Sequence, residues 1–180
     1  MQSTHKQAAT YHEVQQFRQP WLWLLLLATT ITVAGVFMHG FYVQLYLGHP
    51  WGDNPMSDTL LVIAGAVSIL LTAGLTLLFY KLKLVTEVDA NGICIRFYPL
   101  TSKSIRFEDI TSCKLRTYRP IREYGGWGIR FGRNGKAYNV YGNRGVQLEF
   151  TDAMPLLIGS QRPEDLADII NRHIQGEQPG

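Results

Sequence analysis

The chain has 180 residues, two cysteines, five histidines and a formal net charge of +3. This charge is too small to indicate a nucleic-acid-binding protein, and the scattered histidines show no metal-ligand spacing to either cysteine. The mean hydropathy is near zero, but the average hides a concentration of apolar residues between Trp21 and Leu82. The sequence therefore predicts an apolar segment followed by an ordinary polar, globular one.

The first 20 residues are expected to form a cytoplasmic N-terminal tail and an interfacial segment. Tyr11, Val14 and Phe17 recur at three-residue spacing with polar residues between them. This spacing favours a short helix lying on the inner membrane surface, and Pro20 then redirects the chain. For residues 1–10 a flexible polar tail is the alternative.

Two long apolar runs predict a two-helix transmembrane hairpin over residues 21–83. The first helix is expected at about 21–47 and the second at about 59–82, because the runs Trp21–Gly48 and Thr59–Tyr80 contain no charged residue. About 20 apolar residues suffice to cross the hydrocarbon core of a bilayer. The connection "HPWGDNPMSD" is too short to be a domain, so the two helices are expected to be antiparallel neighbours.

The charges that flank the hairpin predict its orientation. The connection carries two aspartates and neither lysine nor arginine, whereas the opposite flanks carry Lys6, Arg18, Lys81 and Lys83. Because positive residues stay on the cytoplasmic side, we expect a multi-pass protein of the cell inner membrane with both termini in the cytoplasm.

Small residues recur every fourth position of the second predicted helix, at Ala64, Ser68, Thr72 and Thr76. Small side chains at this spacing let helix backbones approach each other. The stripe is expected to face the first helix or an identical chain, which would give a homo-oligomer. A chance run of small residues is the alternative.

Residues 84–180 predict a cytoplasmic β domain. Apolar and polar residues alternate, as at Ile93, Ile95 and Phe97, and turn residues separate about seven short strands. A helix is expected at about 163–175, because Pro163 suits an early helical position and an apolar face follows at helical spacing. Strands closed by one amphipathic helix indicate an α+β protein with a small barrel or sandwich.

Several segments of this part resemble a known type of domain. They are "YGGWGIR", "AYNV", "GNRGVQLEF" and "LLIGSQRPEDLADII". They are similar to bacterial membrane-anchored PH-like (pleckstrin-homology-like) domain proteins of unknown function with two N-terminal transmembrane helices. The resemblance implies a PH-like seven-stranded β-barrel or sandwich with a C-terminal capping helix, and it implies no reaction and no cofactor.

The glycine-rich stretch "YGGWGIRFGRNG", residues 124–135, raises the question of a phosphate-binding loop. Such a loop lies between a strand and a helix and is followed by Lys-Ser or Lys-Thr. Here a strand follows and the Lys-Ser or Lys-Thr pair is missing. Residues 132–135 instead predict a hairpin turn, since Asn and Gly accept a positive φ.

A basic segment around this stretch is the candidate partner or lipid surface. Its residues are Arg119, Arg122, Tyr124, Trp127, Arg130 and Arg133. A protein partner would use the two aromatic residues as anchors, surrounded by arginines. Anionic lipid headgroups would attract each basic group by about 1 kcal/mol. A solvated charged face, with Trp127 filling the barrel, is the third interpretation.

Catalysis finds little support in the sequence. No Ser–His–Asp set is visible, because the predicted β domain contains a single histidine, His173. We therefore expect a non-catalytic module without metal or cofactor that binds a membrane or cytoplasmic protein, in interaction or scaffolding within a membrane assembly. Recognition of anionic membrane lipid is the alternative, and an enzyme or transporter ranks third.

Overall fold

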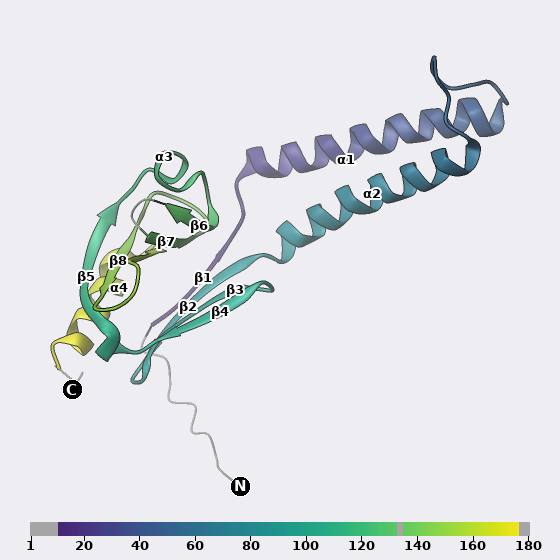
Figure 1. Cartoon of the computed structure of the whole chain (residues 1–180). Coiled ribbons are helices and arrows are strands. Elements are labelled where there is room, and N and C mark those ends of the chain that lie inside the picture. The colour runs from purple at the N-terminus through teal and green to yellow at the C-terminus, as the bar shows by residue number, and fades with distance from the viewer. Residues whose placement is uncertain (1–10, 133–134, 177–180) are drawn as a thin grey trace, which may run out of the picture. The chain divides into compact units, whose positions relative to one another are not determined.

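A computed structural model describes residues 11–132 and 135–176 and divides the chain into two compact units (Figure 1). The helical unit is Arg18–Lys81. The second unit, called the β-unit below, combines the chain up to Phe17 with the chain from Leu82 onwards. The β-unit is therefore discontinuous in sequence, with the helical unit inserted into it.

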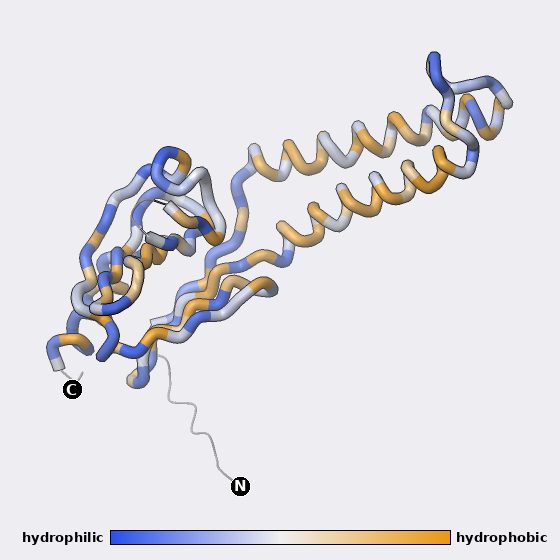
Figure 2. Tube along the Cα trace, viewed as in Figure 1, coloured by the Kyte–Doolittle hydropathy of each residue, from blue (hydrophilic) through white to orange (hydrophobic). Residues whose placement is uncertain are grey.

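The helical unit contains two long helices. Helix α1 (Pro20–Phe41) continues into a π-helical segment, η1 (Tyr42–Tyr46), and α2 (Asp58–Lys81) follows a short connection. Hydrophobic residues recur along the whole length of α1 and α2 (Figure 2). Pro20–Tyr46, with 27 residues, and Asp58–Lys81, with 24, are both long and apolar enough to cross a membrane.

Close contacts hold α1 and α2 side by side. Gly65 of α2 is buried, and a Cβ atom added there would lie 2.4 Å from the Phe41 ring. The side-chain amide of Gln44 donates to the Met56 carbonyl and to Asp58 Oδ1, each at 2.7 Å. These hydrogen bonds join the middle of η1 to the end of the connection and to the first residue of α2.

The first sheet of the β-unit has the order β1-β2-β3-β4, and every neighbouring pair is antiparallel. Alternate side chains of β1 and β2 are buried, as expected for strands with one face on the core. The strands are β1 (Tyr11–Gln16), β2 (Lys83–Asp89), β3 (Gly92–Tyr98) and β4 (Thr101–Ile105).

Strand β1 corrects the sequence prediction for the segment before the first span. Tyr11, Val14 and Phe17 were expected on an interfacial helix, and this expectation is wrong because residues 11–16 pair with β2 along their whole length. The inward face of β1 carries the polar residues Glu13 and Gln15, whereas Val14 points outward. A strand is normally identified by alternating apolar and polar residues. In β1 two inward positions are polar and an outward one is apolar, so this alternation is not visible in the sequence.

The second sheet has the order β5-β8-β9-β7-β6, in which β7 and β9 are parallel. A 3-10 turn, η2 (Phe107–Asp109), precedes β5, and a short helix, α3 (Pro120–Tyr124), separates β5 from β6. The strands are β5 (Ile110–Thr117), β6 (Gly128–Gly132), β7 (Gly135–Asn139), β8 (Arg144–Phe150) and β9 (Leu156–Gly159).

Helix α4 (Pro163–Ile174) closes the chain and packs against β5 and β8. It lies where a helix over 163–175 was expected. Pro163 occupies its first turn, and acidic residues follow there, where the helix dipole favours them. Leu166, Ala167 and Ile170 are fully or almost fully buried. The core of the β-unit therefore includes the apolar face of α4.

The connectivity is simple once two insertions are set aside. Strands β1 to β4 form one antiparallel meander, and β5, β8 and β9 form another that leads into α4. The helical unit is inserted between β1 and β2, and the hairpin β6–β7 between β5 and β8. Among the described residues, eight strands follow α2, one more than the seven expected.

Candidate binding surfaces

The predicted basic residues lie at and around α3 and β6. Arg119, Arg122 and Arg130 are exposed, and the Arg130 Nε donates a 3.0 Å hydrogen bond to the Trp127 carbonyl. Arg133 lies outside the described residues. The structure thus places three of the four predicted arginines at the surface.

The two aromatic residues predicted as partner anchors are largely withdrawn from that surface. Tyr124 is 4% exposed and packs edge-on against Tyr118, so its place on an exposed surface is a wrong prediction. Trp127 is half-buried, and its indole N–H donates to the Gly142 carbonyl at 2.9 Å. Both rings contribute to folding, because a buried aromatic adds much apolar contact.

Two apolar side chains outside the predicted set of surface residues are exposed in the same region. Ile121 of α3 is 71% exposed and Phe131 of β6 is 68% exposed. Helix α3 lies against the end of β6, since a Cβ atom added to Gly132 would be 2.3 Å from the Glu123 carbonyl. We call Arg119, Ile121, Arg122, Arg130 and Phe131 the basic–apolar surface.

The only acidic residue of α3 does not neutralise this surface. Glu123 accepts from the Arg119 backbone N–H at 2.7 Å and forms an ion pair with Arg116, which also donates to Gln147. The Glu123 carboxylate therefore caps α3 and compensates the half-buried Arg116. Within residues 11–132 and 135–176, Glu123 thus pairs with Arg116 and leaves the exposed guanidinium groups of Arg119 and Arg122 for an external anion or partner.

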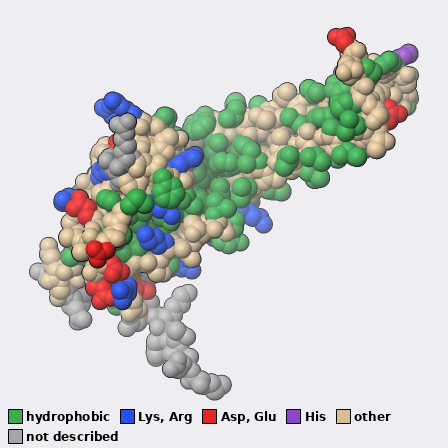
Figure 3. All heavy atoms as spheres, in the orientation of Figure 1, with side chains coloured by type: hydrophobic (Ala, Val, Ile, Leu, Met, Phe, Trp, Pro, Cys, Tyr) green, Lys and Arg blue, Asp and Glu red, His purple; other side chains and the backbone are tan. Residues whose placement is uncertain are grey.

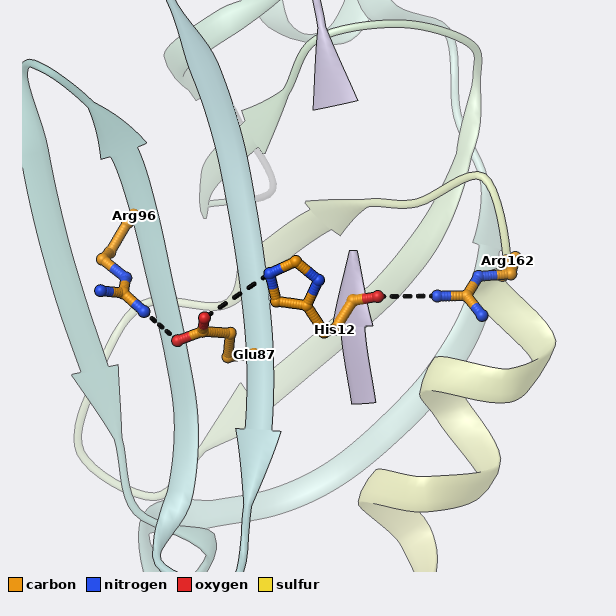
Figure 4. A network of polar contacts seen from close by, with 4 residues as sticks. All are labelled: His12, Glu87, Arg96 and Arg162. Atoms are coloured by element: carbon orange, nitrogen blue, oxygen red, sulfur yellow. Dashed lines mark hydrogen bonds and ion pairs between the residues drawn. The ribbon is translucent and has the colours of Figure 1, made fainter. Parts of the chain in front are cut away.

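A second candidate is a groove of about 590 Å³ on the outer face of the four-stranded sheet. Figure 4 shows its polar end, where Glu87 pairs with Arg96 and lies 3.6 Å from the Nε2 of His12. The Arg162 guanidinium donates to the His12 carbonyl at 2.8 Å. The Glu87 carboxylate is already paired with the Arg96 guanidinium, which favours the basic–apolar surface as the binding region.

On the buried face of the four-stranded sheet, the carboxylate of Glu13 joins β1 to the segment before α4. Glu13 is 7% exposed and accepts from the hydroxyls of Tyr11 at 2.5 Å and Ser160 at 2.6 Å, and from the Gln161 backbone N–H at 2.7 Å. Burial raises the pKa of Tyr11 above its ordinary value, and the hydrogen bond to Glu13 raises it further. Three donors satisfy the buried carboxylate, so the cluster fixes β1 rather than offering a reactive site.

The predicted small-residue stripe on α2 lies half-buried along its whole length. Its residues are Ala64, Ser68, Thr72 and Thr76. The Thr76 hydroxyl lies 3.4 Å from the hydroxyl of Thr30 on α1. Homo-oligomerisation through this stripe stays a prediction.

The part of the chain that the structure describes contains no group of three or more His, Cys, Asp or Glu side chains that could hold a metal ion. Burial raises the pKa of the Cys113 thiol to about 12, so this thiol stays protonated at neutral pH. Its chemistry is that of a small core residue.

Comparisons with family models, with curated proteins and with solved structures find no match to this chain.

Proposed function

We propose that the chain is a non-catalytic, membrane-anchored binding module that recognises a protein partner through the basic–apolar surface. The observation that carries this proposal is the exposure of Ile121 and Phe131 among three exposed arginines. Aromatic residues and arginine are enriched at protein interfaces, and a few such side chains supply most of the binding energy. An acidic, partly apolar surface on the partner would complement it.

Anchoring is supported by the two long helices and by the strand pairing around them. On the face shown in Figure 3, hydrophobic side chains line the two helices, and most charged side chains belong to the β-unit. Strand β1 precedes α1 and β2 follows α2, yet the two strands pair. Both ends of the helical unit must therefore lie on one side of the bilayer, which agrees with two crossings. The flanking cations favour the cytoplasm as that side.

The connectivity of the β-unit supports its resemblance to a PH-like domain. Its two meanders contain four and three strands and end in a capping helix. In this interpretation the membrane hairpin replaces the first β-turn of the domain, and β6–β7 is an added hairpin. The anchor is then part of the domain rather than a tail attached to it.

A comparison of three forms of the full-length chain tests the proposed partner surface. We would purify the wild type, an Ile121→Ser/Phe131→Ser variant and a Met154→Ser control from native membranes, and quantify the co-purifying proteins by mass spectrometry. Met154 is a matched control because it is 64% exposed in the β8–β9 connection. Losing interface anchors of this kind weakens binding by about tenfold or more.

The result expected is a protein retained by the wild type and by the control and lost from the double variant. The same set of proteins with all three forms would overturn the proposal, as would a chain that always elutes alone.

Anionic lipid is the second candidate, because arginines beside an exposed phenylalanine also suit a charged bilayer surface. Amide hydrogen exchange of residues 119–132 would be followed for the full chain in nanodiscs with and without phosphatidylglycerol. Slower exchange only with phosphatidylglycerol would favour lipid. Equal exchange in both nanodiscs would leave the protein partner as the better account.

A further inference from the structure

The β3–β4 turn lies at the end of the sheet where the chain leaves for α1 and returns from α2. Gln16 ends β1 and pairs with Lys83, which begins β2, and Lys83 pairs in turn with Tyr98 at the end of β3. Three residues separate β1 from α1, and one separates α2 from β2. Since each residue extends a chain by at most about 3.6 Å, this end of the sheet stays close to the bilayer if the helices span it.

The side chains of this turn are apolar and exposed. Leu100 is 56% exposed and Tyr98 is 52% exposed, and the Pro99 between them is also exposed. The Leu100 backbone N–H donates to the Phe97 carbonyl at 2.8 Å, which closes the turn and presents these side chains outward. Pro99 is an ordinary turn residue, but turns that face water usually combine Pro with Gly, Asn, Asp or Ser, and here Tyr98 and Leu100 flank it instead.

The opposite end of the same ladder has a turn of the usual polar kind. The Asp89 side chain accepts from the backbone N–H groups of Asn91 at 2.8 Å and Gly92 at 3.1 Å. Asn91 is exposed. The two turns of one sheet thus differ in polarity, and the apolar turn is the one beside the connections to the helices.

A cation accompanies the aromatic ring at the apolar turn. The Lys83 ammonium lies 5.3 Å from the centre of the Tyr98 ring, which is within the range of a cation–π contact. Tyrosine and lysine are both characteristic of the interface between lipid and water. The pair would place the ring at the depth of the headgroups and the ammonium beside the phosphates.

We propose that the turn Tyr98–Pro99–Leu100 inserts into the interfacial layer of the leaflet from which α1 and α2 emerge. The inference rests on the membrane anchoring proposed above. The turn would be a third attachment point beside the two chain connections. Gln16, Lys83 and Tyr98 lie in one row across neighbouring strands, so the three attachment points would hold this end of the sheet parallel to the bilayer.

Photocrosslinking of the full-length chain tests this insertion. The photoreactive residue p-benzoylphenylalanine would replace Leu100 in one form and Asn91 in a matched control, each in phosphatidylethanolamine–phosphatidylglycerol nanodiscs. The two positions lie about 20 Å apart along the ladder, so we expect about tenfold more lipid adduct at position 100 than at position 91. Intact-mass spectrometry would measure the adducts, and circular dichroism would confirm equal folding.

The outcomes separate this inference from the proposed function. Equal yields at the two positions, or no adduct at position 100 in a chain that stays in the nanodisc, would overturn the inserted turn alone. A chain that fails to enter the nanodisc would overturn the membrane anchor and the inserted turn with it. An adduct confined to position 100 would support both.

Discussion

At the scale of single residues, Glu13 joins β1 to the segment before α4. Its carboxylate is buried and accepts hydrogen bonds from three donors on β1 and on the segment before α4. Replacing it with alanine would leave those donors without their shared acceptor. We predict that Glu13→Ala lowers the free energy of unfolding by about 2–4 kcal/mol.

Thermal unfolding of the full chain in detergent would measure this loss. Glu108→Ala is the matched control, because the ion pair that Glu108 forms with Arg106 is exposed. Its effect should stay below about 1 kcal/mol. Equal effects of the two substitutions would contradict the assigned role of Glu13.

The Tyr11 hydroxyl gives this cluster a dependence on alkaline pH. Burial, and then the hydrogen bond to Glu13, raise the pKa of Tyr11 above the value of 10.0 for an exposed tyrosine. The fold thus favours the neutral phenol, and its stabilising contribution is complete below pH 10 and is lost as the pH rises through the folded-state pKa.

We therefore predict that the stability difference between the wild type and Tyr11→Phe is constant from pH 7 to 9 and shrinks above pH 10. Denaturation at a series of pH values would measure it. A difference that does not change with pH would be incompatible with this assignment.

The candidate surface was only partly predictable from its residues. The exposure of Arg119, Arg122 and Arg130 follows from charge, because an unpaired guanidinium is costly to bury. The burial of Tyr124 depends on the short helix α3, which turns the ring towards Tyr118. The amino-acid composition of the segment does not specify which way the Tyr124 ring points.

At the scale of elements, the approach of α1 and α2 depends on glycine. A Cβ atom at Gly65 would lie 2.4 Å from the Phe41 ring, whereas one at Gly74 would meet no atom within 4 Å. Alanine at Gly74 should gain about 0.5–1 kcal/mol of helix stability. The same change at Gly65 must first displace the ring, so we predict that Gly65→Ala weakens the helix pair and that Gly74→Ala does not.

Titration with sodium dodecyl sulfate, followed by tryptophan fluorescence, would compare the two variants. Equal unfolding midpoints would argue against a close approach at Gly65.

The elements also differ in how well the sequence predicts them. The helices follow from two uncharged apolar runs, and β3 follows from the alternation of Ile93, Ile95 and Phe97. Strand β1 was missed because its inward positions hold Glu13 and Gln15. Their acceptor and donor partners lie at residues 159–161, about 145 positions away in sequence. The pattern of residues within β1 cannot reveal contacts with residues so far along the chain.

At the scale of the whole molecule, the split β-unit predicts which fragment folds. A fragment of residues 82–180 lacks β1, which leaves the edge of β2 bare and removes Glu13 from Ser160. We predict that this fragment aggregates. Residues 11–17 joined to 82–180 by Asn-Gly should fold as a soluble monomer, because this dipeptide forms the turn that a two-residue hairpin needs.

Size-exclusion chromatography and circular dichroism would compare the two proteins. A fragment of residues 82–180 that is as soluble and as stable as the joined protein would show that β1 is dispensable.

If α1 and α2 span a bilayer as proposed, their insertion between β1 and β2 couples folding of the sheet to membrane insertion. The first strand leaves the ribosome before either apolar helix exists, and its partner appears only after both have been made. If just one helix crossed the bilayer, the two strands would end up in different compartments and never meet. Strands β1 and β2 can therefore pair only when both helices have crossed the bilayer. A chain in which they do not pair exposes the unpaired edge of β2, which promotes aggregation or proteolysis.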